Sequence, residues 1–182
     1  MDRFENRLHG SSTINTAEIG KSFKYFATAE PIIKQPDARE RASPRMSLFV
    51  DTSIWYAIAD SSDCDSARAK EIVKSGEPLV TTDHILVETW MLLNRRLGGD
   101  VADRFWGILR EGAAAIEMVG PADLETAWQI GLDWKEQDFS IVDRTSFAVM
   151  CRLGIERAAS LDDHFAVFRF GPQRRRSFTI VR

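Results

Sequence analysis

The sequence predicts an α/β fold with a mainly parallel sheet for residues 46–182. Over this stretch, short apolar runs of strand length alternate with longer segments in which apolar residues recur at helical spacing. Capping residues precede several helical segments and glycines end them. Because strands that alternate with helices are joined by crossover connections, they favour parallel pairing over hairpins. We therefore expect one α/β domain with a layered core.

The composition fits a single globular domain. The 182 residues are 44% hydrophobic and 28% charged, with a formal net charge of -3, which argues against a disordered chain. No run approaches the roughly 18 consecutive apolar residues of a membrane-spanning helix, and the first residues lack the apolar stretch of a secretory signal. Cys64 and Cys151 cannot form a disulfide framework. We expect a cytoplasmic protein without a membrane partner.

Residues 1–45 differ from the remainder of the chain. They contain three of the six prolines, many serines and threonines, and little sustained periodicity. We predict a poorly ordered N-terminal extension here, and a start codon chosen too far upstream is the alternative explanation.

Five strands and six helices are expected along residues 46–182. The strands are the apolar runs at 48–50, 78–81, 116–119, 157–161 and 178–181. The helices are 54–58 after a Ser53 cap, 66–74 closed by Gly76, 85–97 capped by Thr82 or Asp83, 101–110, 121–134, and 141–153 capped by Ser140. In the helix that Pro121 opens, Leu124 and Trp128 mark one side.

Charge is distributed unevenly. Residues 46–163 hold 11 basic and 21 acidic side chains. Residues 164–182 hold no acid and five arginines: Arg169, Arg174, Arg175, Arg176 and Arg182. One interpretation is that the body concentrates carboxylates for a metal ion while an arginine edge approaches a polyanion. The other is a solvated tail after the last strand.

Two acidic residues stand where predicted strands end. Asp51 follows the run 48–50, and Asp162 follows the run that ends at Leu161. Ligands of parallel sheets bind outside the carboxyl ends of the strands. A carboxylate there is partly desolvated, which is costly unless a cation or hydrogen-bond donors meet it. Each residue alone also fits a helix N-cap or a turn.

Three further carboxylates have both a functional and a structural interpretation. Glu88 lies on the flank of an apolar helix face, where it either joins the site or faces solvent beside a later arginine. Asp143 stands three residues after Ser140, which is the spacing of a capping box. Asp138 is either a supporting carboxylate or an ordinary loop acid.

Together, Asp51, Glu88, Asp143 and Asp162 come from four elements that could meet at one sheet edge. Clustered carboxylates repel one another unless a hard cation screens them. Mg²⁺ prefers oxygen ligands and needs one or two direct carboxylates, because it keeps several waters. Such a site suits phosphoryl chemistry. The sequence has no HExxH zinc motif and no GxxxxGK[ST] phosphate loop.

Four short motifs contain these acids. They are FVDTS at 49–53, LVE at 86–88, FSIVD at 139–143 leading into SFAVM, and SLDDHF at 160–165. Their order and spacing resemble the PIN domain, a family of metal-dependent ribonucleases that includes the toxins of VapBC-type toxin–antitoxin pairs. The last motif is similar to the family's Thr-x-Asp-x-x-Phe. The resemblance covers residues 46–182 and leaves 1–45 outside.

The resemblance implies a three-layer α/β/α sandwich, a Mg²⁺ cofactor with Mn²⁺ as an alternative, and hydrolysis of RNA phosphodiester bonds. It also implies that Asp51, Glu88, Asp143 and Asp162 form a catalytic, metal-binding quartet. We expect Asp51 and Asp143 to be direct ligands, with the other two acting through water or at a second ion. Supporting or substrate-contacting candidates are Ser53, Asp138, Arg144 and Ser160.

The predicted function is therefore a Mg²⁺-dependent endoribonuclease, the toxin of a type II toxin–antitoxin pair. Its expected partners are RNA, a cognate antitoxin and a second copy of itself. Arg144 and the arginines after Phe168 would contact the RNA backbone. The alternative is a non-catalytic RNA- or partner-binding scaffold on the same fold. Stabilisation by Mg²⁺ or Mn²⁺ would separate the two hypotheses, because a ligand that binds the folded state raises its melting temperature.

Overall fold

The structure, a computed structural model, describes residues 46–182. The extension predicted over residues 1–45 and its start-codon alternative lie outside the described residues. A five-stranded sheet forms the centre of the fold. Its strands are β1 (Leu48–Val50), β2 (Leu79–Thr82), β3 (Ala115–Glu117), β4 (Arg157–Ala159) and β7 (Thr179–Val181).

The sheet has the strand order β3-β2-β1-β4-β7, and every neighbouring pair is parallel. The chain therefore builds outward from β1 through β2 to β3, and then returns to the other side of β1 with β4 and β7. The prediction of an α/β fold with a mainly parallel sheet is confirmed. Because the strand order reverses between β1 and β4, their carboxyl ends form the crevice in which ligands of such sheets bind.

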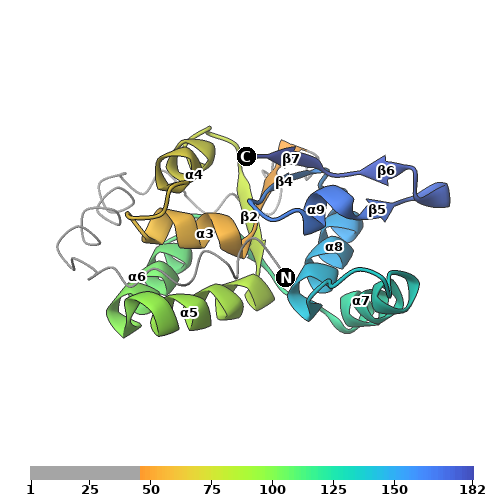
Figure 1. Ribbon diagram of the computed structural model, residues 1–182, viewed down its shortest axis with the longest axis horizontal. Coiled ribbons are helices and arrows are strands. Elements are labelled where there is room, and N and C mark those ends of the chain that lie inside the picture. Colours follow the sequence, from red (N-terminus) through yellow and green to blue (C-terminus); the bar gives the residue numbers. More distant parts are fainter. Residues whose placement is uncertain (1–45) are drawn as a thin grey trace.

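Helices cover both faces of the sheet. They are α3 (Thr52–Ala59), α4 (Ser66–Val73), α5 (Asp83–Leu97), α6 (Gly99–Arg110), α7 (Pro121–Asp133), α8 (Ile141–Leu153) and α9 (His164–Val167). Helices α3 to α6 lie to one side of the strands and α7 to α9 to the other, which gives three layers (Figure 1). Within residues 46–182, none of the helices combines the length and the apolar character needed to cross a membrane.

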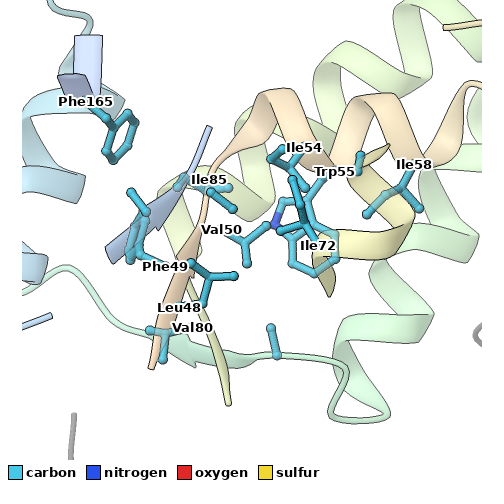
Figure 2. Close-up of a cluster of buried hydrophobic side chains, with 14 of the residues drawn as sticks. Leu48, Phe49, Val50, Ile54, Trp55, Ile58, Ile72, Val80, Ile85 and Phe165 are labelled. Carbon is cyan, nitrogen blue, oxygen red and sulfur yellow. The ribbon is translucent and has the colours of Figure 1, made fainter. Parts of the chain in front are cut away.

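Strand β1 connects the two halves of the core. Successive side chains of a strand point to opposite faces of its sheet. Phe49 points toward Phe165 of α9, and their ring centroids are 6.0 Å apart. Val50 points to the opposite side, toward Ile54 and Ile72 of the helices that follow β1 (Figure 2). All five side chains are buried, so the end of β1, and with it Asp51, has a fixed position.

Side-chain caps define where the helices near this sheet edge begin. The Asp51 side chain accepts the N–H of Ser53 and is the N-cap of α3. The predicted cap at Ser53 is wrong, because Ser53 already lies inside the helix. Thr82 caps α5, as expected for one of the two candidates. Ser140 and Asp143 form the expected capping box at the start of α8.

The structure has elements that the sequence analysis did not predict. The short helix α9 follows β4, and strands β5 (Arg169–Phe170) and β6 (Arg176–Ser177) form an antiparallel hairpin after it. Each is too short to produce a periodic hydrophobic signal. In α7, Ala127 and Ile130 are buried, whereas Leu124 and Trp128, which mark one side of this helix in the sequence, are exposed.

Candidate active site

The predicted site residues gather around the carboxyl ends of β1 and β4. Asp51 directly follows β1, and its N–H donates to the carbonyl of Ala159 at the end of β4, at 3.0 Å. Helix α5 starts directly after β2 and supplies Glu88 from its second turn. Asp143 is the third residue of α8, and Asp162 lies in the loop between β4 and α9. The four carboxylates thus come from four separate elements.

Asp51 is fixed through one of its two carboxylate oxygens. Its Oδ2 atom accepts from the Ser53 hydroxyl at 2.6 Å, the Ser53 N–H at 3.3 Å and the Ser160 hydroxyl at 3.0 Å. The same hydroxyls accept from the loop after β4: Ser53 from the Leu161 N–H at 2.9 Å, and Ser160 from the Asp162 N–H at 3.1 Å. Ser53 and Ser160 therefore join the turn after β1 to the loop after β4, and both set the orientation of Asp51.

Glu88 is oriented by a residue that the sequence analysis did not single out. The Thr52 hydroxyl donates to Glu88 Oε2 at 2.5 Å, and the Thr89 hydroxyl donates to that of Thr52 at 3.3 Å. Both threonines are buried. Glu88 therefore faces the site rather than lying beside an arginine later in α5. Thr52 directly follows Asp51 in the first motif, and this position was the only signal in the sequence that could have identified it as a site residue.

Asp143 and Asp162 meet at His164, which the sequence analysis also did not assign to the site. Oδ2 of Asp143 accepts from the Ser140 N–H at 2.8 Å and lies 3.1 Å from His164 Nδ1. Oδ1 of Asp162 accepts from the His164 N–H at 2.6 Å and lies 3.4 Å from the same ring nitrogen. The capping-box role of Asp143 and its place in the acidic group are therefore compatible.

All four carboxylates share one arrangement. In each, one oxygen is held by the protein, as described above. The second oxygens accept no hydrogen bond from the part of the chain that the structure describes: Oδ1 of Asp51, Oε1 of Glu88, Oδ1 of Asp143 and Oδ2 of Asp162. Each carboxylate is thus oriented by one oxygen and retains the other for a ligand.

The electrostatics of the four groups show that they act on one another. Burial raises the pKa of Asp51, and the nearby Asp143 raises it further. Burial also raises the pKa of Glu88 to about 7, with added repulsion from the other three carboxylates. The pKa of Asp162 rises to about 6, again chiefly through burial. No Lys or Arg within residues 46–182 forms an ion pair with the quartet side chains; the ring of His164, which lies beside Asp143 and Asp162 and lowers the pKa of Asp162, is the basic group that the described residues place there.

This donor set fits a divalent cation bound through oxygen. Hard cations such as Mg²⁺ and Mn²⁺ take carboxylate oxygens, and a cation would favour the ionised carboxylates against the burial and repulsion that raise these pKa values. Among residues 46–182, the most compact acidic group is a different one, Asp63 and Asp65 with Cys64 in the α3–α4 turn, whose ligand atoms lie within 4.8 Å. The quartet is more open than this. An open arrangement leaves room for the water ligands that Mg²⁺ keeps.

Two candidates remain, Asp138 and Arg144. Asp138 is exposed between α7 and α8, and among the described residues no hydrogen bond joins it to the quartet. Arg144 is half-buried and lies so close to Gly131 of α7 that any side chain at that position would meet its guanidinium group. Its side chain therefore packs between α7 and α8.

Known proteins share this fold and these motifs. A model of the PIN domain matches residues 48–171. The 23S rRNA-specific endonuclease VapC20 of Mycobacterium tuberculosis is 41% identical over 125 residues, which cover 68% of this chain and 95% of that protein. Ribonuclease VapC26 of the same organism is 27% identical over 124 residues, covering 67% of this chain and 92% of that protein.

A solved structure agrees with the sequence relatives. The crystal structure of Mycobacterium tuberculosis VapC20, described as a sarcin–ricin loop cleaving toxin, matches with a TM-score of 0.63 and 38% identity. The match covers 65% of this chain and 92% of that one. These relatives are named as endonucleases or ribonucleases, and so support nuclease activity. The chain therefore belongs to the PIN-domain family and, within it, to the VapC-type toxins.

Proposed function

We propose that this protein is a Mg²⁺-dependent endoribonuclease that hydrolyses RNA phosphodiester bonds, with Mn²⁺ as an alternative cofactor. The observation that carries the proposal is the arrangement of Asp51, Glu88, Asp143 and Asp162. Each has one oxygen held by the protein and one that accepts no hydrogen bond from the described residues. Four clustered carboxylates, with no Lys or Arg of residues 46–182 paired to them, repel one another in the ionised form, and a divalent cation relieves that repulsion.

The four carboxylates would have different roles at the ion. Asp51 and Asp143 would hold it directly, and Glu88 and Asp162 would act through water or at a second ion. A bound divalent ion polarises the scissile phosphate and lowers the pKa of the attacking water. The protein supplies orientation: the hydroxyls of Ser53 and Ser160 hold Asp51, and that of Thr52 holds Glu88. Hydrolysis of this kind leaves 5′-phosphate and 3′-hydroxyl ends.

We further propose that the substrate is ribosomal RNA. VapC20, which is described as a 23S rRNA-specific endonuclease, aligns over 95% of its length at 41% identity. Its crystal structure is described as that of a sarcin–ricin loop cleaving toxin. The sarcin–ricin loop of 23S rRNA is accordingly the first site to test, and the reaction would occur in the cytoplasm, where ribosomes are found.

We also propose a cognate antitoxin and a homodimer, because the chain belongs to the VapC-type toxins. Light scattering of the purified protein would measure its mass in solution, and a monomer at all concentrations would contradict the homodimer. Co-purification with the tagged product of the adjacent gene would test the antitoxin. Absence of a complex, together with no relief of toxicity on co-expression, would contradict that assignment.

The deciding experiment is cleavage of purified ribosomes in Mg²⁺ and in EDTA, followed by mapping of the new RNA ends. We expect one discrete cut in 23S rRNA with a 5′-phosphate, abolished by EDTA and by Asp51→Asn. Metal-independent cleavage would contradict the mechanism. A folded protein that neither cuts RNA nor is stabilised by Mg²⁺ or Mn²⁺ would support the scaffold alternative.

A further inference from the structure

We propose that His164 is a positioning residue of the metal site, which fixes Asp143 and Asp162 relative to each other. This inference rests on the proposed function, because it concerns how the same site is arranged for its cation. Asp143 belongs to α8 and Asp162 to the loop after β4. The two therefore need a connection if their carboxylates are to keep one relative orientation.

His164 supplies that connection from two of its atoms. Its backbone N–H donates to Asp162 Oδ1 at 2.6 Å. Its ring Nδ1 lies 3.1 Å from Asp143 Oδ2 and 3.4 Å from Asp162 Oδ1. One residue thus contacts a carboxylate from each of the two elements, and it does so from the first position of α9.

The contact determines which oxygen of Asp143 is left for a ligand. An ionised carboxylate only accepts hydrogen bonds, so the ring nitrogen that faces it must carry the hydrogen. His164 donates to Oδ2, the oxygen that also accepts from the Ser140 N–H. Two donors on one oxygen prevent the carboxylate from rotating. Oδ1 then remains directed away from both donors.

The core holds the imidazole ring in this orientation. The ring packs edge-to-face with Phe139, with centroids 5.4 Å apart and planes at 78°. Phe139 is buried and in turn packs against Phe147 and Phe168, with centroids at 5.2 and 6.1 Å. A donor whose ring packs on a buried aromatic side chain that is itself fixed by the core can orient a ligand residue before any cation binds.

The test compares three variants with the wild type by titrating the EDTA-treated, dialysed protein with Mn²⁺ in a calorimeter. His164→Leu removes the donor, and His164→Asn keeps one, because the Asn amide nitrogen lies near the position of imidazole Nδ1. We expect the leucine variant to bind Mn²⁺ about 10- to 100-fold more weakly, and the asparagine variant to stay within a few-fold of the wild type. His84→Leu is the matched control, since His84 Nδ1 contacts the Thr145 hydroxyl at 3.1 Å and none of the quartet.

Kinetics give a second readout. In His164→Leu, we expect kcat at limiting Mn²⁺ to fall with the metal affinity and to recover at saturating Mn²⁺, while the KM for RNA stays unchanged. Wild-type Mn²⁺ affinity in a folded His164→Leu protein would overturn the inference, and so would equal weakening in the leucine and asparagine variants. If His164→Leu does not fold, the asparagine variant decides: weakened binding overturns the proposal. Failure of the proposed function would give a different result from failure of this inference, because the wild-type protein itself would then bind no Mn²⁺.

Discussion

The acidic sheet edge and the arginine-rich segment 164–182 both concentrate charge of one sign, but the fold treats them in opposite ways. At the sheet edge, the side chains of Asp51, Glu88, Asp143 and Asp162 form no ion pair with any Lys or Arg of residues 46–182. In the C-terminal segment, four of the five arginines form hydrogen bonds or ion pairs with other residues of the chain. Charges that are paired within the chain are explained by the fold, whereas four carboxylates that meet one histidine and no Lys or Arg of residues 46–182 indicate an external cation.

The arginines of the C-terminal segment mainly connect it to the body. Four make internal contacts: Arg169 with the carbonyls of Ala166, Val167 and Phe168, Arg174 with Asp133, Arg176 with Glu156, and Arg182 with Asp163 and the Asp162 carbonyl. Arg174 and Arg176 also lie over the rings of Trp134 and Phe170, at 5.0 and 4.8 Å. These partners give four of the arginines a structural role, and the expectation that the arginine edge contacts RNA stays a prediction. Arg175, which is exposed, forms no ion pair or hydrogen bond with the described residues.

The largest effect is expected for Asp51→Asn. Asn keeps the N-cap of α3 and removes a buried charge whose pKa burial raises, so the melting temperature without metal should not fall. Stabilisation by Mn²⁺ at 100 times its Kd, about 2.7 kcal/mol or roughly 5–10 °C for a chain of this size, should be lost. RNA cleavage should fall by at least about 1,000-fold, since a metal ion contributes several kcal/mol to catalysis.

Thermal melts with and without Mn²⁺ test this prediction, with Asp100→Asn on the exposed face of α6 as the matched control. A clear loss of stability without metal would show that Asp51 has a structural role that the isosteric amide cannot replace. Full Mn²⁺ stabilisation of the variant would show that the ion binds elsewhere.

A smaller loss is expected for Thr52→Val, which keeps the shape of a buried side chain and removes one hydroxyl. Glu88 Oε2 loses its 2.5 Å donor, and the Thr89 hydroxyl loses its acceptor. We expect Mn²⁺ affinity to fall about 10- to 100-fold and the free energy of unfolding to fall by about 1–3 kcal/mol. Calorimetric titration and denaturant unfolding measure the two effects. Thr126→Val is the control, because Thr126 lies on the exposed face of α7 and its hydroxyl donates only to the Ala122 carbonyl of the same helix. Equal Mn²⁺ affinity in both variants would contradict the role of Thr52.

A moderate effect is expected from pH. Folding raises the pKa of Glu88 from 4.5 to about 7 and that of Asp162 from 3.8 to about 6. Between these values the folded state binds more protons than the unfolded chain, so the stability of the metal-free protein should decrease as pH rises from about 4 to 7. Mn²⁺ binding has the opposite dependence, because the ion competes with protons for the carboxylates.

Melting temperatures in EDTA across this pH range, measured for the wild type and Glu88→Gln, isolate the contribution of Glu88. We expect the wild type to lose more stability than the variant as pH increases. Parallel curves would mean that Glu88 titrates near its ordinary value in the folded protein.

The sequence was informative where the signal was local. Strand ends, capping residues and the four short motifs predicted the parallel sheet and the elements that supply Asp51, Glu88, Asp143 and Asp162. Each of these signals lies within a few residues of the feature it predicts. The N-cap of α3 was assigned two residues too late because both Asp51 and Ser53 are good capping residues, and only the backbone shows which one lies outside the helix.

The missed features depend on contacts between distant parts of the chain. Thr52 meets Glu88 across the β1–β2 crossover, and His164 meets Asp143 across the α8–β4 connection. Neither contact can be predicted from hydrophobic periodicity or from the spacing of residues in the sequence. The partners of Arg174 and Arg176, Asp133 and Glu156, likewise become neighbours only when the β5–β6 hairpin folds against the body.

The smallest effects are expected in the C-terminal segment, where Arg174 and Arg175 should behave differently. Arg174→Ala removes an exposed ion pair and a cation–π contact, each worth about 1 kcal/mol or less, so the melting temperature should fall by roughly 2–6 °C. Arg175→Ala should leave the melting temperature unchanged. If Arg175 contacts an RNA phosphate, its loss should reduce the slope of log Kd for RNA against log salt by about one. An unchanged slope in Arg175→Ala would mean that the acidic edge, and not this segment, meets the substrate, and would sharpen the contrast between the two regions.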